Sequence, residues 1–296
     1  MTKPTYVCLM KKVTLLISFA GLLILIGCNQ CTTDTPPAGD GNTTDTSGIP
    51  ADEISILSWN LESDGSDIDT LVNQLKIEGS FDLYGFSEVK SIDWAYKIKE
   101  AIEEISTHRY RFILGTTGRS DRLMILYDTS RFGELDQFEI DSINVGGNVR
   151  APLVAKLKET DSGLEFYFMV NHLYRSRAEA RLQQAEMLND WINLQDLPVI
   201  AVGDYNFDYD LDSGEGNPGF DAFVEEGMIV WIEPELMIKS QCSPDYNSIL
   251  DFVFINDDAL TWEASSEIIV RENDCGNEDY YSDHRPVVAV LDPTPE

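Results

Sequence analysis

Between residues 54 and 291 the chain alternates short apolar runs with segments of helical periodicity, and this alternation limits the folds open to it. The runs are rich in β-branched and aromatic residues and end at Gly, Asp, Asn or Ser, which predicts strands. The predicted strands are 54–59, 83–87, 111–114, 123–127, 153–157, 166–170, 199–202, 250–255 and 287–291. Helices are expected at 68–76, 93–105 and 176–194. Many strands and few helices predict an α/β fold, with a two-layered β core flanked by helices.

The third predicted helix has the most specific signal. Ser176 and Glu179 have the spacing of a capping box, so we expect the helix to begin at Ser176. Four apolar residues then recur at helical spacing: Leu182, Ala185, Leu188 and Trp191. On the opposite face we expect Arg177 and Arg181 to be solvated and to pair with Glu179 and Glu186.

Functional polar side chains lie at six places beside or within these strands. They are Asn60, Glu88, His172, Asp204 with Asn206, Asp251, and Asp283 with His284. Asn, Asp and Glu supply the hard oxygen ligands that Mg²⁺, Mn²⁺ or Ca²⁺ prefer, and histidines suit acid–base and phosphate-binding roles. Most of these clusters taken singly are more often turns or strand caps. Asp251 is harder to dismiss, because a carboxylate in the run Ile-Leu-Asp-Phe-Val-Phe is costly unless a partner such as His284 relieves it.

The six clusters, in this order, resemble the endonuclease/exonuclease/phosphatase superfamily with its deoxyribonuclease-I-like fold, over about residues 54–291. The resemblance is nearest to the secreted bacterial branch. There, Asn-His-Leu precedes an Arg-rich helix with a Gln-Ala pair, here Gln184-Ala185, and the chain closes with Ser-Asp-His-Arg-Pro-Val. The resemblance implies an α/β fold: a four-layered α/β sandwich of two packed mixed β-sheets flanked by helices.

The resemblance also implies a metal site. Asn60 and Glu88 match positions that help to hold the catalytic divalent ion, and Asp283 matches a further acidic position there. The implied cofactor is Mg²⁺ or Mn²⁺, with Ca²⁺ as a further candidate. Asp204 and Asn206 match the pair that orients the attacking water and contacts the scissile phosphate.

The remaining catalytic positions carry histidines. His284 matches the base-like histidine, Asp251 matches the carboxylate that fixes its tautomer, and His172 matches the histidine that contacts phosphate oxygens. In the nuclease branch a Glu after a Gly-Arg pair orients the last of these. Here Gly118-Arg119 is followed by the shorter Asp121.

Two arginines are candidates for contact with the substrate phosphate. Arg150 resembles the Arg-x-Pro arginine of the nucleases, and Arg119 is the arginine of the Gly-Arg pair. Phosphodiester hydrolysis needs a Lewis acid, an oriented water and a proton acceptor, which a metal–carboxylate cluster beside an Asp–His pair supplies.

The N-terminus reads as a targeting signal. Lys11 and Lys12 precede an apolar run at 13–26 that ends in Leu-Ile-Gly-Cys, which resembles the bacterial lipoprotein box with Cys28 as the lipidated residue. We expect a signal peptide at 1–27, a flexible tether at 28–51 and one catalytic domain at 52–293. The protein would be exported and lipid-anchored to the outer or cytoplasmic membrane of a bacterial envelope. The alternative is a plain signal peptide with a chance cysteine.

Cysteine usage agrees with export. Cys242 and Cys275 lie in two C-terminal loops and are expected to pair in an oxidising compartment, the alternative being two free thiols.

The charge balance bears on the substrate. The chain has 21 Lys and Arg against 52 Asp and Glu, a net charge of −31. Such a surface does not bind nucleic acid tightly through non-specific phosphate contacts. Seven arginines nevertheless lie in or beside the motifs: Arg119, Arg122, Arg150, Arg175, Arg177, Arg181 and Arg285. Apart from the two on the helix face, we expect these to form a local cationic rim around the site.

We therefore predict a monomeric, divalent-metal-dependent phosphoester hydrolase, with a nuclease-type phosphodiesterase favoured and nucleic acid as one candidate substrate. The first alternative is a lipid or small-molecule phosphodiesterase or phosphatase, sphingomyelinase-like or inositol-phosphate-like. It would favour an exposed apolar loop near the site, for which residues 220–237 are the candidate. The second alternative is a non-catalytic surface binding protein. Against it, none of the six motifs has lost its functional side chain.

Overall fold

The computed structural model describes residues 53–271, 274–275 and 280–293. The predicted signal peptide, the tether and the lipidation site Cys28 lie outside this part of the chain. Within it, no helix is both long and apolar enough to cross a membrane.

The first of two six-stranded sheets is mixed. Its strands, in order across the sheet, are β11 (Glu263–Ile268), β12 (Val287–Asp292), β1 (Ile54–Asn60), β2 (Leu83–Val89), β4 (Arg122–Asp128) and β3 (Tyr110–Leu114). β1 runs parallel to β2 and antiparallel to β12, and Asn60 is in register with Ser87. The parallel pair brings the carboxyl ends of β1 and β2 to the same edge.

The second sheet is also mixed. Its strands, in order, are β5 (Phe132–Glu139), β6 (Leu153–Glu159), β7 (Glu165–His172), β8 (Val199–Asp210), β10 (Ser248–Asn256) and β9 (Ile229–Trp231). β7 and β8 are parallel, with His172 in register with Asp204, and β10 runs antiparallel to β8. A register shift between Ile249 and Asp251 places Asp251 opposite Asp204.

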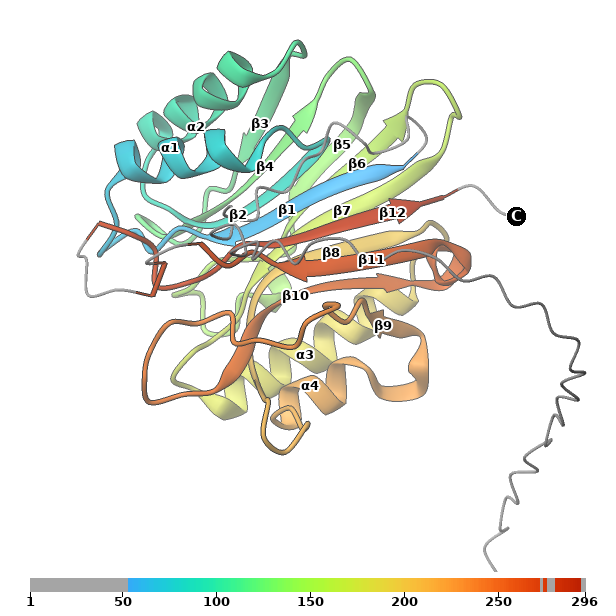
Figure 1. The fold of residues 1–296 in the computed structure, drawn as a ribbon. Coiled ribbons are helices and arrows are strands. Elements are labelled where there is room, and N and C mark those ends of the chain that lie inside the picture. The colour runs from blue at the N-terminus through green and yellow to red at the C-terminus, as the bar shows by residue number, and fades with distance from the viewer. Residues whose placement is uncertain (1–52, 272–273, 276–279, 294–296) are drawn as a thin grey trace, which may run out of the picture. The chain divides into compact units, whose positions relative to one another are not determined.

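Helices form the outer layers (Figure 1). The first sheet is covered by α1 (Ile68–Glu78) and α2 (Ile92–Ile105), and the second by α3 (Ala178–Asn193) and α4 (Pro218–Phe223). Short 3-10 turns occur at Asp141–Ile143, Glu225–Gly227 and Asp257–Thr261. The four layers match the fold that the family resemblance implies.

Strand alternation divides the core into two apolar clusters. In β1, Ile54 and Ile56 belong to the cluster that packs the two sheets together, whereas Leu57 and Trp59 belong to the cluster under α1 and α2. Side chains of successive strand residues point to opposite faces, so a strand buried on both sides needs apolar residues throughout. All seven residues of β1 are buried accordingly.

The expected capping box of the third helix is wrong. α3 begins at Ala178, and its N-cap residue Arg177 makes no side-chain capping hydrogen bond. A side chain of the helix itself holds the segment that precedes it. The Arg181 guanidinium donates to the carbonyl oxygens of Tyr174 (2.8 Å) and Arg175 (2.7 Å).

The expectation that Arg181 is solvated is therefore also wrong, since this residue is only 7% exposed. The other arginine of the pair, Arg177, is exposed, and it stacks on the Tyr174 ring at 4.9 Å.

The two sheets approach each other closely at Gly85 of β2. A Cβ atom on Gly85 of β2 would lie 2.4 Å from Val202 Cγ2 and 3.0 Å from Val170 Cγ2 across the interface. Gly85→Ala should therefore lower the free energy of unfolding by about 1–3 kcal/mol. Gly133→Ala on β5 is the matched control, because nothing lies within 3.9 Å of its added Cβ. The control should leave stability unchanged or raise it by up to about 1 kcal/mol. Equal stability of both variants in urea denaturation would show that the sheets are less tightly packed at Gly85.

Candidate active site

The polar residues predicted from the sequence gather at one edge of the sandwich. They line or border a cleft of about 700 Å³. Both parallel strand pairs end here, so Asn60 and Glu88 reach it from the first sheet, and His172 and Asp204 from the second. Strand ends that are far apart in sequence thus come together at one site.

An aspartate–histidine pair lies at the base of the cleft. Asp251 Oδ2 is 2.7 Å from His284 Nδ1, and the two residues are 1% and 8% exposed. The other ring nitrogen, Nε2, lies 3.8 Å from Asp204 Oδ2 and 3.7 Å from Asp283 Oδ1. The sequence prediction that Asp251 is relieved by His284 matches this geometry.

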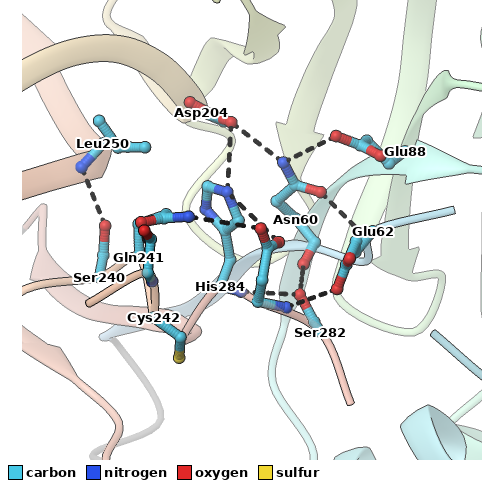
Figure 2. A network of polar contacts seen from close by, with 12 residues as sticks. Asn60, Glu62, Glu88, Asp204, Ser240, Gln241, Cys242, Leu250, Ser282 and His284 are labelled. Atoms are coloured by element: carbon cyan, nitrogen blue, oxygen red, sulfur yellow. Dashed lines mark hydrogen bonds and ion pairs between the residues drawn. The ribbon is translucent and has the colours of Figure 1, made fainter. Parts of the chain in front are cut away.

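Asn60 links the carboxylates of the two sheets, as Figure 2 shows. Its side-chain nitrogen donates to Asp204 Oδ2 at 3.0 Å and to Glu88 Oε1 at 3.2 Å. Its side-chain oxygen accepts from the backbone N–H of Glu62 at 3.0 Å, and Glu62 Oε2 in turn accepts from the backbone N–H of Asp283 at 2.7 Å. The three acids Glu62, Glu88 and Asp283 are thereby brought to one side of the cleft.

Backbone strain also concentrates at the cleft. Five non-glycine residues in the described part of the chain have positive φ, and four of them line the cleft: Glu62, Glu88, Asn206 and Asp208. Such conformations are costly and persist where the surrounding structure enforces them, often at functional sites.

A second group surrounds His172, which is 5% exposed. Its Nε2 lies 3.3 Å from Asp204 Oδ2 and its Nδ1 lies 3.7 Å from Asp121 Oδ1. Asp121 also forms a 2.7 Å ion pair with Arg150 Nη1. The shorter acid after Gly118-Arg119 therefore does face the histidine, and it shares its carboxylate with Arg150.

Burial and charge move the pKa values of these groups in different directions. Burial lowers the pKa of His172 well below its ordinary value, and the nearby cations Arg150 and His284 lower it further. Burial acts in the same direction on His284, but Asp251, through its charge and hydrogen bond, with help from Asp204, raises the pKa of His284 to about 10. Burial raises the pKa of Asp204 to about 7, although His284 opposes that rise. The site thus holds one neutral and one cationic histidine beside a carboxyl group that titrates near neutral pH.

The predicted site residues differ in how closely the structure brings them together. Nine of the eleven lie at or directly against the cleft: Asn60, Glu88, Asp121, Arg150, His172, Asp204, Asn206, Asp283 and His284. Asp251 lies behind His284. Arg119 is exposed and does not line the cleft.

The expected cationic rim is wrong. Of the five arginines expected to form it, only Arg150 and Arg175 line the cleft, and Arg285 is bound to Asp274 at 2.8 Å. Nine acids line it instead: Glu62, Glu88, Asp64, Asp121, Asp204, Asp208, Asp210, Asp245 and Asp283.

The candidate apolar loop at 220–237 is also wrong as a feature of this site. None of its residues lines the cleft, and Phe223 is fully buried, where it packs against Phe254 with ring centroids 4.8 Å apart.

Sequence reasoning missed several contributors. Glu62 stands two residues after Asn60 and could have been found from that spacing. Gln241 and Ser240 lie in a loop with no motif, and only the folded chain places them beside Asp283 and Asp251. In the same loop, Cys242 forms a disulfide with Cys275, as the sequence favoured.

Comparison with known proteins establishes the fold. No protein-family model and no curated protein matches the chain. An endonuclease/exonuclease/phosphatase family protein from Bacteroides thetaiotaomicron has a TM-score of 0.59 at 19% identity, over 81% of this chain and 97% of that one. A mannosyl-6-phosphatase from the same organism has a TM-score of 0.60 at 18% identity, over 80% and 99%. D. rerio TDP2 complexed with a single-strand DNA product has a TM-score of 0.60 at 18% identity, over 81% and 98%.

The chain therefore has the endonuclease/exonuclease/phosphatase fold. The four-layered sandwich of two mixed sheets, which the motif order implied, is confirmed.

The two histidines should titrate differently in protein kept in EDTA. His284 should be protonated at pH 7 and lose its proton near pH 10, whereas His172 should stay neutral well below pH 6.5. Asp251→Asn should lower the pKa of His284, because it removes a negative charge that stabilises the imidazolium. Long-range ¹H–¹⁵N spectra of the ring nitrogens measure both, with the exposed Asp161→Asn as the control. A wild-type His284 that titrates near 6.5, or one unaffected by Asp251→Asn, would contradict the pairing.

Proposed function

We propose that this protein is a divalent-cation-dependent hydrolase of phosphoester bonds. The observation that carries the proposal is the buried Asp251–His284 pair, whose free ring nitrogen faces Asp204, which Asn60 in turn links to Glu88. This arrangement supplies a proton acceptor and an imidazolium beside a group of hard oxygen ligands. The fold shared with phosphatase and TDP2 structures supports the same chemistry.

The residues present suit a hard cation. Burial raises the pKa of Glu62, and repulsion from Asp283 and Glu88 raises it further, so these two acids oppose the ionisation of Glu62. A divalent cation would relieve that repulsion, and oxygen ligands of this kind prefer Mg²⁺ or Mn²⁺. Glu88 is the principal candidate ligand, with Glu62 and Asp283 beside it and Asn60 orienting Glu88. When bound, the cation would act as a Lewis acid on a phosphate oxygen.

A group of possible ligands at Glu88, Asp121 and His172 suits such a cation less well. Arg150 already pairs with Asp121 at 2.7 Å, and its positive charge opposes a second cation at that point. We infer that the part of the cleft beside Arg150 and His172 receives the anionic phosphate.

The chain's own groups account for the proton transfers. Asp204, with a pKa near 7, is suited to accept a proton from the attacking water, and the backbone N–H of Asn206 fixes its Oδ1 at 2.9 Å. His284, held protonated by Asp251, would donate from Nε2 to the ester oxygen that leaves as its bond to phosphorus breaks. His172 would supply a neutral ring nitrogen to the phosphate. Arg150 and Arg175 would offset the negative charge of the phosphate.

The lining of the cleft favours a small phosphoester over a polynucleotide. Nine acids face two arginines, and even with a bound divalent cation the walls beyond the reacting phosphate stay negative. A polyanion would be repelled there, because nucleic-acid binding relies on cations along the backbone. The cleft instead suits a substrate with hydroxyl groups or a cationic substituent. Its carboxylates, Asn247 and the exposed ring of Tyr246 could bind such groups. The phosphorylated sugar named for one structural neighbour has this chemistry. The nuclease type remains the competing proposal, supported by the DNA-bound TDP2 neighbour.

Purified protein should hydrolyse a small chromogenic phosphoester, lose that activity in EDTA and regain it with Mg²⁺ or Mn²⁺. Glu88→Gln should lower kcat/KM by about 10²-fold or more, because it removes a charged ligand, whereas the exposed Asp161→Asn should not.

A panel of substrates tests the substrate class, and it should contain a phosphomonoester, a phosphodiester, a sugar phosphate and single-stranded DNA. Activity that survives exhaustive chelation would refute the cation mechanism. Turnover of DNA above all small substrates would refute the small-substrate proposal, and a lack of any turnover would favour a binding protein.

We further propose that the protein is exported and anchored by a lipid on Cys28. The support is the lipoprotein-box sequence and the polar composition of residues 29–51. Cys28→Ser should release the protein from the membrane fraction, because it removes the residue that would carry the acyl chains on which stable anchoring depends. The activity should be unchanged. Cys31→Ser in the same polar segment is the matched control and should stay membrane-bound. Identical partitioning of wild type and Cys28→Ser would refute the lipid anchor.

A further inference from the structure

Ser240 lies in the segment between β9 and β10 and is fully buried. Its hydroxyl oxygen accepts from the backbone N–H groups of Leu250 (2.9 Å) and Asp251 (3.2 Å). A serine hydroxyl has two lone pairs and one proton. Since both lone pairs are taken, the proton points to the remaining neighbour, the Asp251 carboxylate at 2.7 Å.

The same carboxylate oxygen of Asp251 contacts His284. Oδ2 receives the Ser240 hydroxyl and lies 2.7 Å from His284 Nδ1, while Oδ1 is buried without a hydrogen-bond partner. The orientation of the carboxylate therefore depends on Ser240 as much as on the histidine.

The backbone around Ser240 is fastened to the backbone around His284. The N–H of Arg285 donates to the Ser240 carbonyl at 2.7 Å, and the N–H of Cys242 donates to the Asp283 carbonyl at 2.7 Å. Gln241 and His284 form an antiparallel bridge between these two bonds. A shift of residues 240–242 would thus move both members of the catalytic pair.

A disulfide holds the far side of this segment. Cys242 is bonded to Cys275, and the neighbouring Asp274 accepts two hydrogen bonds from the Arg285 guanidinium, at 2.8 and 3.1 Å. Arg285 also donates to the carbonyl of Lys239 at 2.9 Å. Segments 239–242, 274–275 and 283–285 therefore form one cross-braced unit.

We propose that Ser240 is a positioning residue that orients the Asp251–His284 pair, and that the Cys242–Cys275 disulfide keeps Ser240 in place. The kinetic part of this proposal rests on the proposed hydrolase function. The hydroxyl acts through Asp251 and does not line the cleft.

Ser240→Ala should lower kcat by about 10-fold to 100-fold, which corresponds to the loss of one hydrogen bond to a charged group, and should leave KM nearly unchanged. The rate is measured per folded molecule, with the folded fraction taken from circular dichroism. Ser266→Ala is the matched control, because Ser266 is also buried and donates to the Ile232 carbonyl at 2.7 Å, away from the cleft. The control should lose stability but keep kcat. Equal kcat in Ser240→Ala and wild type would overturn the positioning role.

A double variant separates positioning from general destabilisation. Ser240→Ala combined with Asp251→Asn should be no slower than Asp251→Asn alone, because the serine acts only through that carboxylate. Additive losses would overturn the proposal. The ring N–H resonance of His284 Nδ1 gives a readout that does not need turnover: it should shift in Ser240→Ala and not in Ser266→Ala. If wild type hydrolyses no substrate but this resonance shifts, the proposed function fails while the positioning stands; an unmoved resonance refutes the positioning.

The disulfide is tested by Cys242→Ser/Cys275→Ser and by wild type reduced with a dithiol. Both should show a several-fold lower kcat with unchanged KM, at a temperature where circular dichroism shows a folded protein. The decrease should be smaller than in Ser240→Ala, because the backbone bonds between residues 240–242 and 283–285 remain. Full kcat in the cysteine-free pair would overturn the bracing role of the disulfide.

Discussion

The carboxylate of Asp204 is the group on which the arrangement of the site depends. It is 2% exposed, and a buried carboxylate is tolerated only with partners. Its Oδ2 accepts from Asn60 at 3.0 Å and faces ring nitrogens of His172 at 3.3 Å and His284 at 3.8 Å. These partners come from both sheets, so satisfying one carboxylate fixes the two walls of the cleft relative to each other.

Because of this constraint, the residues that hold the two sheets together at this edge are also the candidate catalytic residues. The parallel pairing of β7 with β8 sets His172 opposite Asp204, and the shifted register of β10 sets Asp251 opposite the same residue. Burial raises the pKa of Asp204 and lowers that of His172, while carboxylates hold His284 protonated. One fold-determining arrangement therefore leaves an acceptor and a donor of protons at neutral pH.

Much of this was predictable from the sequence. The interior strands carry continuous apolar runs, and every run predicted as a strand corresponds to one in the structure. The three strands that were missed, β5, β9 and β11, all lie at sheet edges. β5 and β11 bury few of their side chains and lack a continuous apolar run, and β9, although apolar, has only three residues. The site residues were found from motif order, whereas the role of Ser240 and the burial of Arg181 depend on contacts that no local pattern encodes.

The central claim is that a divalent cation binds at Glu88 together with Glu62 and Asp283, and not with His172, whose Nε2 lies 4.0 Å from Glu88 Oε1. Anomalous scattering from crystals soaked with Mn²⁺ tests it most directly. The account predicts a single strong peak within ligand distance of the Glu88 carboxylate, beside Glu62 and Asp283, and its loss in Glu88→Gln. A peak ligated by His172, or no peak at Glu88 at saturating Mn²⁺, would contradict it.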